Sequence, residues 1–308
     1  MVAAKAEIPK ISVIIPTRNR LELLRNAVAS VFGQTEQDFE LIVVDDGSKD
    51  GTHAYLEALA ADDSRVRPIF NQQSRGGAAA RNTGISVSRG RWIAFLDDDD
   101  EWLRHKLALQ LSALAAAPNA VACSSSYLRR NAAGRTRVVH IPRTASFEDL
   151  LYGSVMGGTS LCLCNGAAVR GIGGFDPMFR SGQDWDLWTR LSQIGTLISC
   201  AEPTVIYRAH DGVRISNDMA AQYQGARRFY FKYKQFMGNG VRAHRLAYLW
   251  YIMSRQPERG IWHRLKYLTL AISKAGTGAA VRYTTSSLPR LLADIVSCQR
   301  HKANRHRR

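Results

Sequence analysis

The stretch "IAFLDDDDEW" (93–102) places four aspartates and a glutamate directly behind an apolar run. Adjacent carboxylates repel one another, and each raises the pKa of its neighbours unless a cation lies among them. The oxygens of Asp97 to Asp100 are hard ligands, of the kind that hold Mg²⁺ or Mn²⁺ between one or two carboxylates and a diphosphate. A solvated turn would also tolerate the crowding. The stretch therefore predicts either an exposed loop or a divalent-cation site.

Two further polar clusters follow apolar runs of the same kind. "PTRNR" (16–20) comes after the first run, and "DDGSKDGT" (45–52) comes after the second. By itself, Asp-Asp-Gly-Ser is an ordinary turn, in which Asp50 would cap the following helix. A carboxylate such as Asp46 can also accept the imide N–H of a uracil or thymine ring. The choice between turns and one shared site depends on whether the fold brings the clusters together.

Short β-branched runs alternate with helical patterns over the first hundred residues. The expected strands are 11–16, 39–44, 65–70 and 91–96, and the expected helices are 20–32, 50–60 and 76–88. This alternation predicts an α/β fold with a mostly parallel sheet, in which ligands bind beyond the carboxyl ends of the strands. Pro68 favours an edge position for the third strand. We expect Asp100 and Glu101 to cap a helix that begins near Leu103.

The composition is that of an ordinary globular protein of 308 residues, 45% hydrophobic and 22% charged. Its five cysteines show no CxxC spacing, which favours reduced, buried thiols in a cytoplasmic protein over a zinc site or a disulfide framework. The first ten residues lack a signal core, and no apolar run approaches the ~18 residues of a membrane span. We therefore expect a soluble or peripheral cytoplasmic protein.

The net charge of +16 is concentrated at the end of the chain. From Gly225 onward there are 18 Lys and Arg against two acids, whereas residues 1–224 hold 24 basic and 24 acidic residues. This change predicts a neutral catalytic domain over residues 1–220 and a basic helical region over 221–308. A disordered end is expected at "RHKANRHRR" (300–308).

The basic region has three interpretations. Its apolar residues recur at helical spacing between cations, so it could be a helical cap whose solvated face is basic. Basic helices that carry Trp and Tyr also lie at anionic lipid surfaces, which would place the protein at the inner face of the cytoplasmic membrane. Nucleic-acid binding is the least favoured, because no recognisable motif accompanies the charge.

Five motifs in order resemble family 2 of the nucleotide-sugar glycosyltransferases, which have the GT-A fold. The motifs are "SVIIPTRNR", "ELIVVDDGSKDGT", "GGAAARNTGI", "GRWIAFLDDDDEW" and "GGFDPMFRSGQDWDLWTRL", and the resemblance covers about residues 10–215. The resemblance implies a Rossmann-like sheet with flanking helices. It also implies inverting transfer of a sugar from a nucleotide-diphosphate donor, most often a UDP-sugar, to a glycan or lipid-linked acceptor. The Gln-x-x-Arg-Trp element of the processive members is missing.

The resemblance also assigns roles to residues. Those on the nucleotide and donor side are Pro16, Thr17, Arg18, Asp45, Asp46, Arg81, Asp97 and Asp98. Asp99 is expected to bind the divalent cation, Mn²⁺ or Mg²⁺, and His210 resembles a C-terminal histidine that reaches the metal or diphosphate. Asp184 takes the position of the general base. The acceptor-side candidates are Trp102, Gln183 and Trp185, and Gln183 stands where the family usually has glutamate.

Each assignment has a structural alternative. Asp184 could be a helix N-cap, Arg81 could pair with a loop carboxylate, Trp102 could belong to the core and His210 could lie in a surface loop. For the whole chain, a sugar-phosphate nucleotidyltransferase is the alternative enzyme, but "PTRNR" is not its glycine- and lysine-rich phosphate loop. A non-catalytic membrane- or nucleic-acid-binding protein with a degenerate transferase domain is the other alternative.

Overall fold

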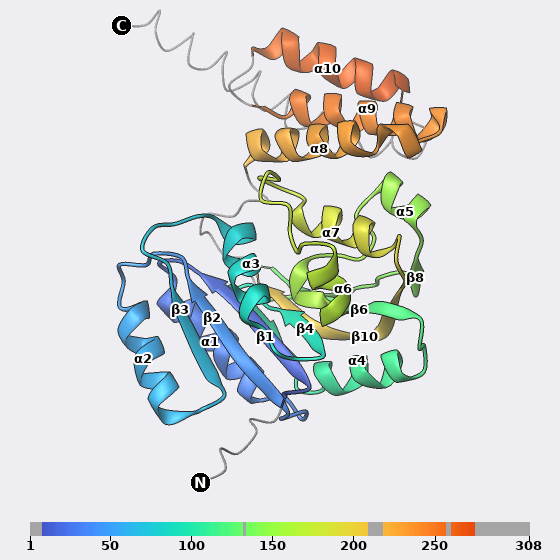
Figure 1. The fold of residues 1–308 in the computed structure, drawn as a ribbon. Coiled ribbons are helices and arrows are strands. Elements are labelled where there is room, and N and C mark those ends of the chain that lie inside the picture. Colours follow the sequence, from blue (N-terminus) through green and yellow to red (C-terminus); the bar gives the residue numbers. More distant parts are fainter. Residues whose placement is uncertain (1–7, 132–133, 209–217, 257–259, 275–308) are drawn as a thin grey trace, which may run out of the picture. The chain divides into compact units, whose positions relative to one another are not determined.

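The computed structural model describes residues 8–131, 134–208, 218–256 and 260–274 (Figure 1). The chain divides into two compact units. The first comprises Met1–Met178 and Gln183–Gly212, and the second comprises Phe179–Gly182 and Val213–Arg308. The second unit thus carries the basic part of the chain.

The amino-terminal half of the first unit is a parallel sheet. Its strands are β1 (Ile11–Thr17), β2 (Phe39–Asp45), β3 (Val66–Phe70) and β4 (Trp92–Phe95), in the order β3-β2-β1-β4. Every residue of β1 and β2 is buried, as expected for strands covered on both faces. The four strands and the edge position of β3 confirm the expectations from the sequence, with Pro68 on the edge strand.

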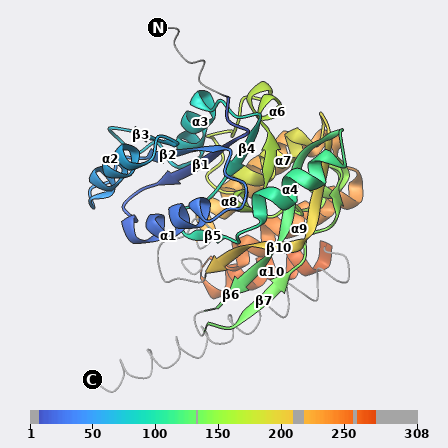
Figure 2. The same cartoon turned by 90° about the horizontal axis from the view of Figure 1, so that it is seen from below.

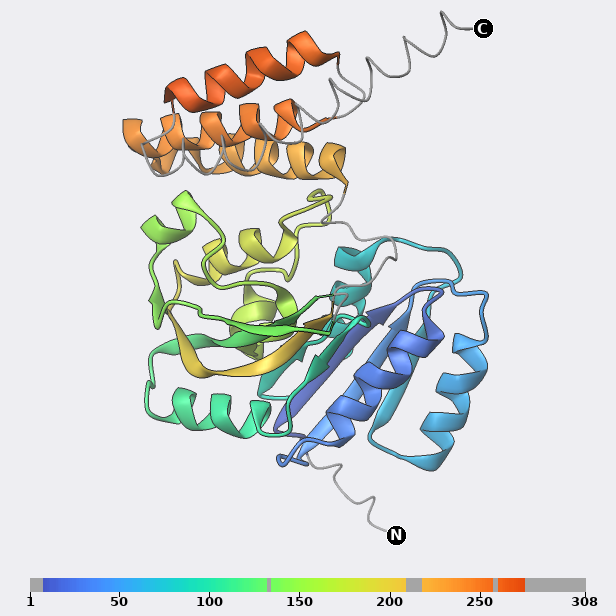
Figure 3. The same cartoon turned by 180° about the vertical axis from the view of Figure 1, so that it is seen from behind.

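Three helices connect these strands. They are α1 (Leu21–Phe32), α2 (Thr52–Asp62) and α3 (Gly77–Val87). The first two lie on one face of the sheet, seen in front in Figure 3, and α3 lies on the other, as right-handed crossovers require. Helix α3 packs closely on β1 because Gly84 has no side chain; a Cβ there would lie 2.5 Å from Ile14 Cγ2. This packing fixes the second half of α3 against the middle of β1.

The sheet continues through a second half whose strands run in both directions. Its members are β5 (Asp100–Trp102), β6 (Ala120–Arg130), β7 (Thr136–Val139), β8 (Thr144–Ala145), β9 (Leu163–Asn165) and β10 (Thr196–Arg208). Strand β9 is antiparallel to both β4 and β6, and β10 is parallel to β6. The carboxyl ends of β6 and β10 therefore open at the same edge as those of β1 and β4. Figure 2 shows β6, β7 and β10 side by side.

One expectation about this region is wrong. Asp100 and Glu101 do not cap a helix near Leu103; they lie in β5, which pairs with β10 through Asp100↔Tyr207. The next helix, α4 (Lys106–Ala115), begins later, after His105. The end of the acidic run is a strand because it pairs with β10. Since β10 comes from a distant part of the sequence, the local pattern could not predict this pairing.

Shorter elements complete the first unit. They are α5 (Phe147–Tyr152), η1 (Thr159–Leu161), α6 (Gly166–Gly171) and α7 (Gln183–Leu191). Helix α5 has a capping box, in which Ser146 accepts from the Asp149 backbone and Asp149 accepts from the Ser146 backbone. Of these elements, η1 and α7 carry side chains that reach the site described below.

The second unit consists of packed helices, α8 (Met219–Tyr233), α9 (Asn239–Ser254) and α10 (Ile261–Lys274), with a short turn η3 (Lys234–Phe236). Helix α9 lies between the other two (Figure 1). Its Leu249 and Ile252 pack with Ala226 of α8, and its Ala247 packs with Leu268 and Ala271 of α10. Within the described residues, no helix combines the length and the apolar character needed to cross a membrane.

Candidate active site

The acidic run forms a tight turn at the carboxyl end of β4. The backbone N–H of Asp100 donates to the Asp97 carbonyl at 3.0 Å, which folds the run back on itself. Carboxylate oxygens of Asp97, Asp99 and Asp100 consequently all lie within 4.8 Å of one another. Asp98 points elsewhere, because its Oδ2 accepts from Thr17 Oγ1 at 2.9 Å. Three carboxylates thus gather at one point and the fourth links β4 to β1.

Two arginines offset part of this negative charge. Arg20, at the start of α1, donates to Asp98 Oδ1 at 3.0 Å and lies 3.5 Å from Asp99 Oδ2. Arg81, on α3, pairs with Asp97 Oδ1. Burial nonetheless raises the pKa of Asp98 to about 6, against the opposing effects of Arg20 and Thr17. The arginines therefore oppose the effect of burial on Asp98 without cancelling it.

Two residues of η1 hold the turn from the other side. Ser160 Oγ accepts from the Asp97 backbone N–H at 3.0 Å and donates to Asp100 Oδ2 at 2.6 Å. Thr159 Oγ1 donates to Asp97 Oδ1 at 3.1 Å. The sequence analysis missed both residues, because a serine and a threonine in "GGTSLC" carry no signal of their own. Only the pairing of β9 with β4 brings η1 to the acidic turn.

Asp184 lies in the first turn of α7, beside the acidic turn. It is inside the helix rather than at the N-cap, and its Oδ1 accepts from the Trp185 backbone at 2.8 Å. The Asp184 side chain is partly buried, and this desolvation raises its pKa. The negative charge of Asp97 raises the pKa of Asp184 further, whereas the positive charge of Arg81 lowers it. A carboxylate with a raised pKa is better suited to accept a proton.

The other oxygen of Asp184 lies near Gly158, which is packed against a tyrosine. A Cβ built on Gly158 would lie 3.9 Å from Asp184 Oδ2 and only 2.7 Å from Tyr207 Oη. Gly158 has φ −77° and ψ 172°, which any residue can adopt, so the backbone does not require glycine there. The missing side chain instead lets the Tyr207 phenol pack against the Gly158 backbone, close to the Asp184 carboxylate.

Tyr207, which the sequence analysis also missed, is part of the same charged environment. Burial raises its pKa well above the ordinary value, and Asp100, Asp97 and Asp184 raise it further. It therefore stays a neutral phenol that can donate or accept a hydrogen bond. The signal available in the sequence was only its position at the end of an apolar run.

The third polar cluster, after β2, is organised around Asp46. Its two oxygens accept from Ser74 Oγ at 2.7 Å, Asn71 Nδ2 at 2.9 Å and the backbone of residues 75 and 76 at 2.9–3.0 Å. These bonds outweigh burial and lower the pKa of Asp46. The backbone N–H of Asp46 in turn donates to the Thr17 carbonyl at 2.9 Å. Asp46 therefore holds the loop before α3 against the ends of β1 and β2.

The structure places the remaining donor-side candidates as follows. Pro16 and Asp45 are buried at the ends of β1 and β2, and Arg18 is exposed. Asp45 Oδ1 accepts from the Ser48 backbone at 2.9 Å. The ends of β1, β2 and β4 thus meet in one place, as expected. His210 lies outside the described residues.

Two acceptor-side expectations are wrong. Trp102 is 4% exposed, donates from Nε1 to the Ser160 carbonyl at 3.0 Å and is therefore a core residue. Trp185 is 8% exposed and donates to the Leu150 carbonyl at 2.7 Å. Neither ring offers a face to a sugar. Gln183 does face the site, because its Oε1 accepts from Arg81 at 3.2 Å, and Arg81 does pair with a loop carboxylate.

The residues present fit a divalent cation. Asp97, Asp99 and Asp100 offer hard oxygen donors close enough to share one ion, and Mg²⁺ and Mn²⁺ prefer such ligands. Asp98 is outside this set because Thr17 and Arg20 engage both of its oxygens. A small acidic set leaves coordination positions for a diphosphate.

Comparisons with known proteins agree with this geometry. The chain is 29% identical over 230 residues to TuaG of Bacillus subtilis (strain 168), named as a teichuronic acid biosynthesis glycosyltransferase, covering 74% of this chain and 88% of TuaG. It is 40% identical over 102 residues to the Escherichia coli UDP-Glc:alpha-D-GlcNAc-diphosphoundecaprenol beta-1,3-glucosyltransferase WfgD, covering 33% of this chain and 40% of WfgD. WfgD is thus much longer than the part that this chain matches.

Two solved structures share the fold. S. aureus TarS 1–349 in complex with UDP-GlcNAc gives a TM-score of 0.65 at 15% identity, over 88% of this chain and 82% of that one. The mannosyltransferase PcManGT from Pyrobaculum calidifontis, in complex with GDP-Man and Mn²⁺, gives a TM-score of 0.58 at 20% identity. The match covers 93% of this chain and 81% of PcManGT. The fold is that of the GT-A glycosyltransferases, as expected.

Residues 12–170, just over half of the chain, match the family described as Glycosyl transferase family 2. The chain belongs to this family and is a glycosyltransferase.

Proposed function

We propose that the protein transfers a sugar, with inversion, from a nucleotide-diphosphate sugar to an acceptor hydroxyl. The observation that carries the proposal is the position of Asp184, with one oxygen near Gly158 and Tyr207 and the carboxylate within electrostatic reach of Asp97. A single base beside an acidic, cation-binding turn suits direct displacement, in which the hydroxyl attacks the anomeric carbon opposite the leaving diphosphate. No covalent intermediate, and hence no activated serine or cysteine, is needed.

The donor would lie across the ends of β1, β2 and β4. The nucleoside would sit near Thr17 and Asp46, with UDP favoured because TarS, a structural neighbour, was solved with UDP-GlcNAc. Its diphosphate would reach Asp97, Asp99 and Asp100, which would hold Mn²⁺ or Mg²⁺; the ion would offset the charge that develops on the leaving group. Asp46 would act mainly by holding the loop before α3, since its oxygens are occupied within the protein.

Asp184 would remove the proton of the acceptor hydroxyl as the new bond forms. Tyr207 would position the same hydroxyl, because its phenol and the Asp184 carboxylate both lie near Gly158. Arg81 would hold Gln183 and Asp97 in place, and this keeps the donor and the base in line. Correct positioning of two substrates supplies a large part of the acceleration in such reactions.

The acceptor class follows from the relatives. WfgD is named for a sugar carried on diphosphoundecaprenol, and TuaG for teichuronic acid biosynthesis. We infer that this chain likewise works in the assembly of a bacterial surface polysaccharide or glycolipid, on a lipid-linked acceptor at the cytoplasmic face of the membrane.

The helical unit would bind that membrane. Trp262 on α10 is 80% exposed, and Phe231 on α8 and Phe236 are about half exposed. Phe231 lies between two cations, with Arg227 and Lys234 each 5.2 Å from its ring centroid. Exposed aromatic rings beside cations are suited to an anionic lipid interface.

Sedimentation with anionic vesicles tests the membrane proposal. The wild type should bind at low salt and lose binding as salt rises, and Trp262→Ala with Phe231→Ala should bind several-fold more weakly. Ile194→Ala in the first unit, whose side chain is 52% exposed, is the matched control. Equal vesicle binding by all three proteins would show that these aromatic residues of the helical unit do not bind the membrane.

A thermal-shift panel tests the donor site. UDP, dTDP, GDP and CMP are each added with and without Mn²⁺, and one diphosphate nucleotide should stabilise the protein only when the metal is present. Asp99→Ala should lose this stabilisation, whereas Asp62→Ala, at the exposed end of α2, should keep it. Stabilisation of Asp99→Ala equal to the wild type would eliminate Asp99 as a metal ligand.

A further inference from the structure

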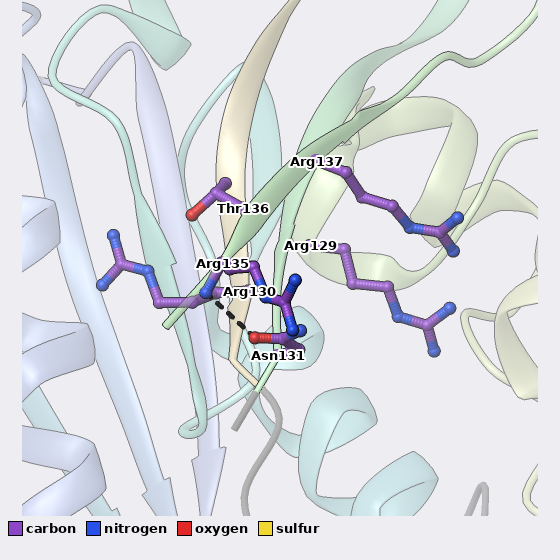
Figure 4. Close-up of a pocket in the computed structure, with 6 residues that line it drawn as sticks. All are labelled: Arg129, Arg130, Asn131, Arg135, Thr136 and Arg137. Carbon is purple, nitrogen blue, oxygen red and sulfur yellow. Dashed lines mark hydrogen bonds between the residues drawn. The ribbon is translucent and has the colours of Figure 1, made fainter. Parts of the chain in front are cut away.

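The hairpin of β6 and β7 carries four arginines at its end. Arg129, Arg130, Arg135 and Arg137, with Asn131 and Thr136, line an open cavity of about 380 Å³ (Figure 4). Among the residues that the structure describes, no carboxylate lies within ion-pair distance of any of the four, although residues 1–224 as a whole hold equal numbers of basic and acidic residues. The hairpin is therefore a concentrated, uncompensated positive surface.

Two of these arginines face each other across the hairpin. Arg129 and Arg137 are directly opposed in the β6–β7 register, and Figure 4 shows their side chains extending side by side in one direction. Like charges at directly opposed positions destabilise a sheet. Both residues are exposed, so their long side chains could diverge in solvent. Their parallel arrangement is that of two guanidinium groups ready to share one anion.

The register also fixes where this pair lies relative to the active site. Asp100 pairs with Tyr207, Tyr207 pairs with Arg129, and Arg129 pairs with Arg137. Neighbouring strands are about 4.8 Å apart. The arginine pair therefore begins about 10 Å from the backbone of Asp100, in the same row of the sheet as Tyr207. Directly paired residues direct their side chains to the same face, so the pair is on the active-site side.

We propose that Arg129 and Arg137 bind the phosphate or diphosphate of the acceptor while the acceptor hydroxyl lies between Asp184 and Tyr207. The proposal rests on the proposed function and specifies its acceptor as an anionic one. Guanidinium groups bind phosphate oxygens through paired N–H donors, which gives both charge and orientation. The donor diphosphate is not the ligand of this pair, because the cation-binding carboxylates are two strands away on β5 and its preceding turn.

The separation also limits the acceptor. The acceptor hydroxyl at Asp184 and the acceptor phosphate at the arginine pair would be a short distance apart, measured along the row of paired residues from Tyr207 to Arg129. The acceptor sugar should therefore lie close to the phosphate group rather than at the far end of a long chain. Such an acceptor is an early intermediate, supplied by a reaction that first attaches a sugar to a polyprenyl phosphate.

The test uses farnesyl diphosphate as the probe and isothermal titration calorimetry of the full chain. EDTA is present throughout, so that the carboxylate turn cannot bind a diphosphate through a metal ion. Arg129→Ala with Arg137→Ala should lower the affinity for farnesyl diphosphate at least tenfold. Arg104→Ala is the control, because Arg104 is an exposed arginine that follows the last residue of β5, Trp102. The affinity of this variant for farnesyl diphosphate should equal that of the wild type. Arg129→Lys with Arg137→Lys keeps the charge without the paired donors and should give an intermediate value.

Two further probes distinguish the source of the anion. Farnesol should not bind. Inorganic pyrophosphate should bind more weakly than farnesyl diphosphate; equal binding would keep the anion site but overturn its assignment to a lipid-linked acceptor. Unchanged affinity in the double alanine variant would overturn the site itself.

Stabilisation by UDP with Mn²⁺ is measured on the same proteins to separate the two proposals. The double variant should retain it, which also shows that the variant is folded. If the wild type shows this stabilisation but does not bind farnesyl diphosphate, only the arginine pair is contradicted. If the wild type does not respond to any nucleotide with metal, the proposed function itself fails.

Discussion

Arg81 Nη1 donates to Gln183 Oε1 at 3.2 Å, and the other terminal nitrogen of the same guanidinium pairs with Asp97. One buried arginine thereby connects α3, the acidic turn after β4 and the first turn of α7. Gln183 occupies the position where a glutamate was expected from the family resemblance. Its neutral amide accepts the arginine bond without adding a further charge beside Asp97 and Asp184.

The Gln183→Glu variant tests the consequence of this neutral amide. A glutamate would keep the bond to Arg81 but place a new negative charge near Asp184. Like charges raise the pKa of a carboxyl group, so the acid limb of the kcat/KM profile should move upward by on the order of one pH unit. Gln183→Met, which removes the bond without adding charge, is the control and should lower the rate without that shift. An unmoved acid limb in Gln183→Glu would show that Asp184 is not the titrating base.

The close contact between Gly158 and Tyr207 gives a second prediction. In Gly158→Ala the new Cβ would lie 2.7 Å from Tyr207 Oη, a distance at which the phenol must move, although the backbone angles of Gly158 suit alanine. The variant should keep nucleotide binding with metal but lose at least tenfold in transfer. Gly153→Ala, at a glycine with open space around it, is the matched control. Wild-type transfer by Gly158→Ala would mean that the acceptor does not enter there.

Asp46 supports a prediction about pH. Its pKa is lowered in the folded state by bonds from Ser74 and the backbone before α3, so it stabilises the fold above its unfolded pKa of about 3.9 and stops doing so as pH falls through the lower folded value. Asp46→Asn should lose about 2–3 kcal/mol of the free energy of unfolding at pH 7. This difference should shrink below about pH 4. Urea denaturation of both proteins across this range measures it, and a constant difference at all pH values would contradict the linkage.

Lys106 supports the opposite dependence. It is fully buried, its Nζ lies 4.4 Å from the Trp102 ring centroid, and burial lowers its pKa to about 8. The unfolded chain holds the Lys106 proton more tightly than the folded protein does, so burying the charged lysine lowers the free energy of unfolding. This loss of stability is fully present at pH 7 and declines between pH 8 and 10.5. A shift of this size corresponds to about 3 kcal/mol.

Replacing this lysine should therefore stabilise the protein. Lys106→Met should raise the free energy of unfolding at pH 7 by about 1–3 kcal/mol, less than the full cost because the bond to Gln110 and the contact with Trp102 are lost. The gain should diminish toward pH 10. Denaturation at pH 7, 8 and 10 checks this, and Lys266→Met on α10 is the control. A loss of stability at pH 7 would show that the buried ammonium is well compensated.

Much of the first half of the fold could be predicted from the sequence. Continuous apolar runs and Pro68 gave β1 to β4 and the edge position of β3, because strands covered on both faces have a clear local pattern. The acidic run was less well predicted. Asp100 and Glu101 have the local character of helix caps, but they pair with Tyr207 and Ile206 of β10, and no local pattern reports a partner a hundred residues away.

The same limit applies to the candidate site. Asp97 and Asp99 were found because charged residues are rare behind apolar strands, and Arg81 and Asp184 were found through the family resemblance. Ser160, Gly158 and Tyr207 were not, because their types are common and only the fold gives them neighbours. Trp102 and Trp185 were placed on the acceptor side, whereas both indole N–H groups bond to backbone carbonyls inside the protein.

The most direct test of the account is transfer by Asp184→Asn. Radiolabelled UDP-sugars and sugar-diphosphate-lipid acceptors are first screened with the wild type to find a productive pair. On that pair, Asp184→Asn should keep the donor affinity and lose about 10²–10⁴-fold in kcat, the usual contribution of a general base. Trp185 and the rest of α7 should remain in place, as shown by an unchanged melting temperature. A variant that transfers sugar at the wild-type rate would contradict the account, because Asp184 would not be the base.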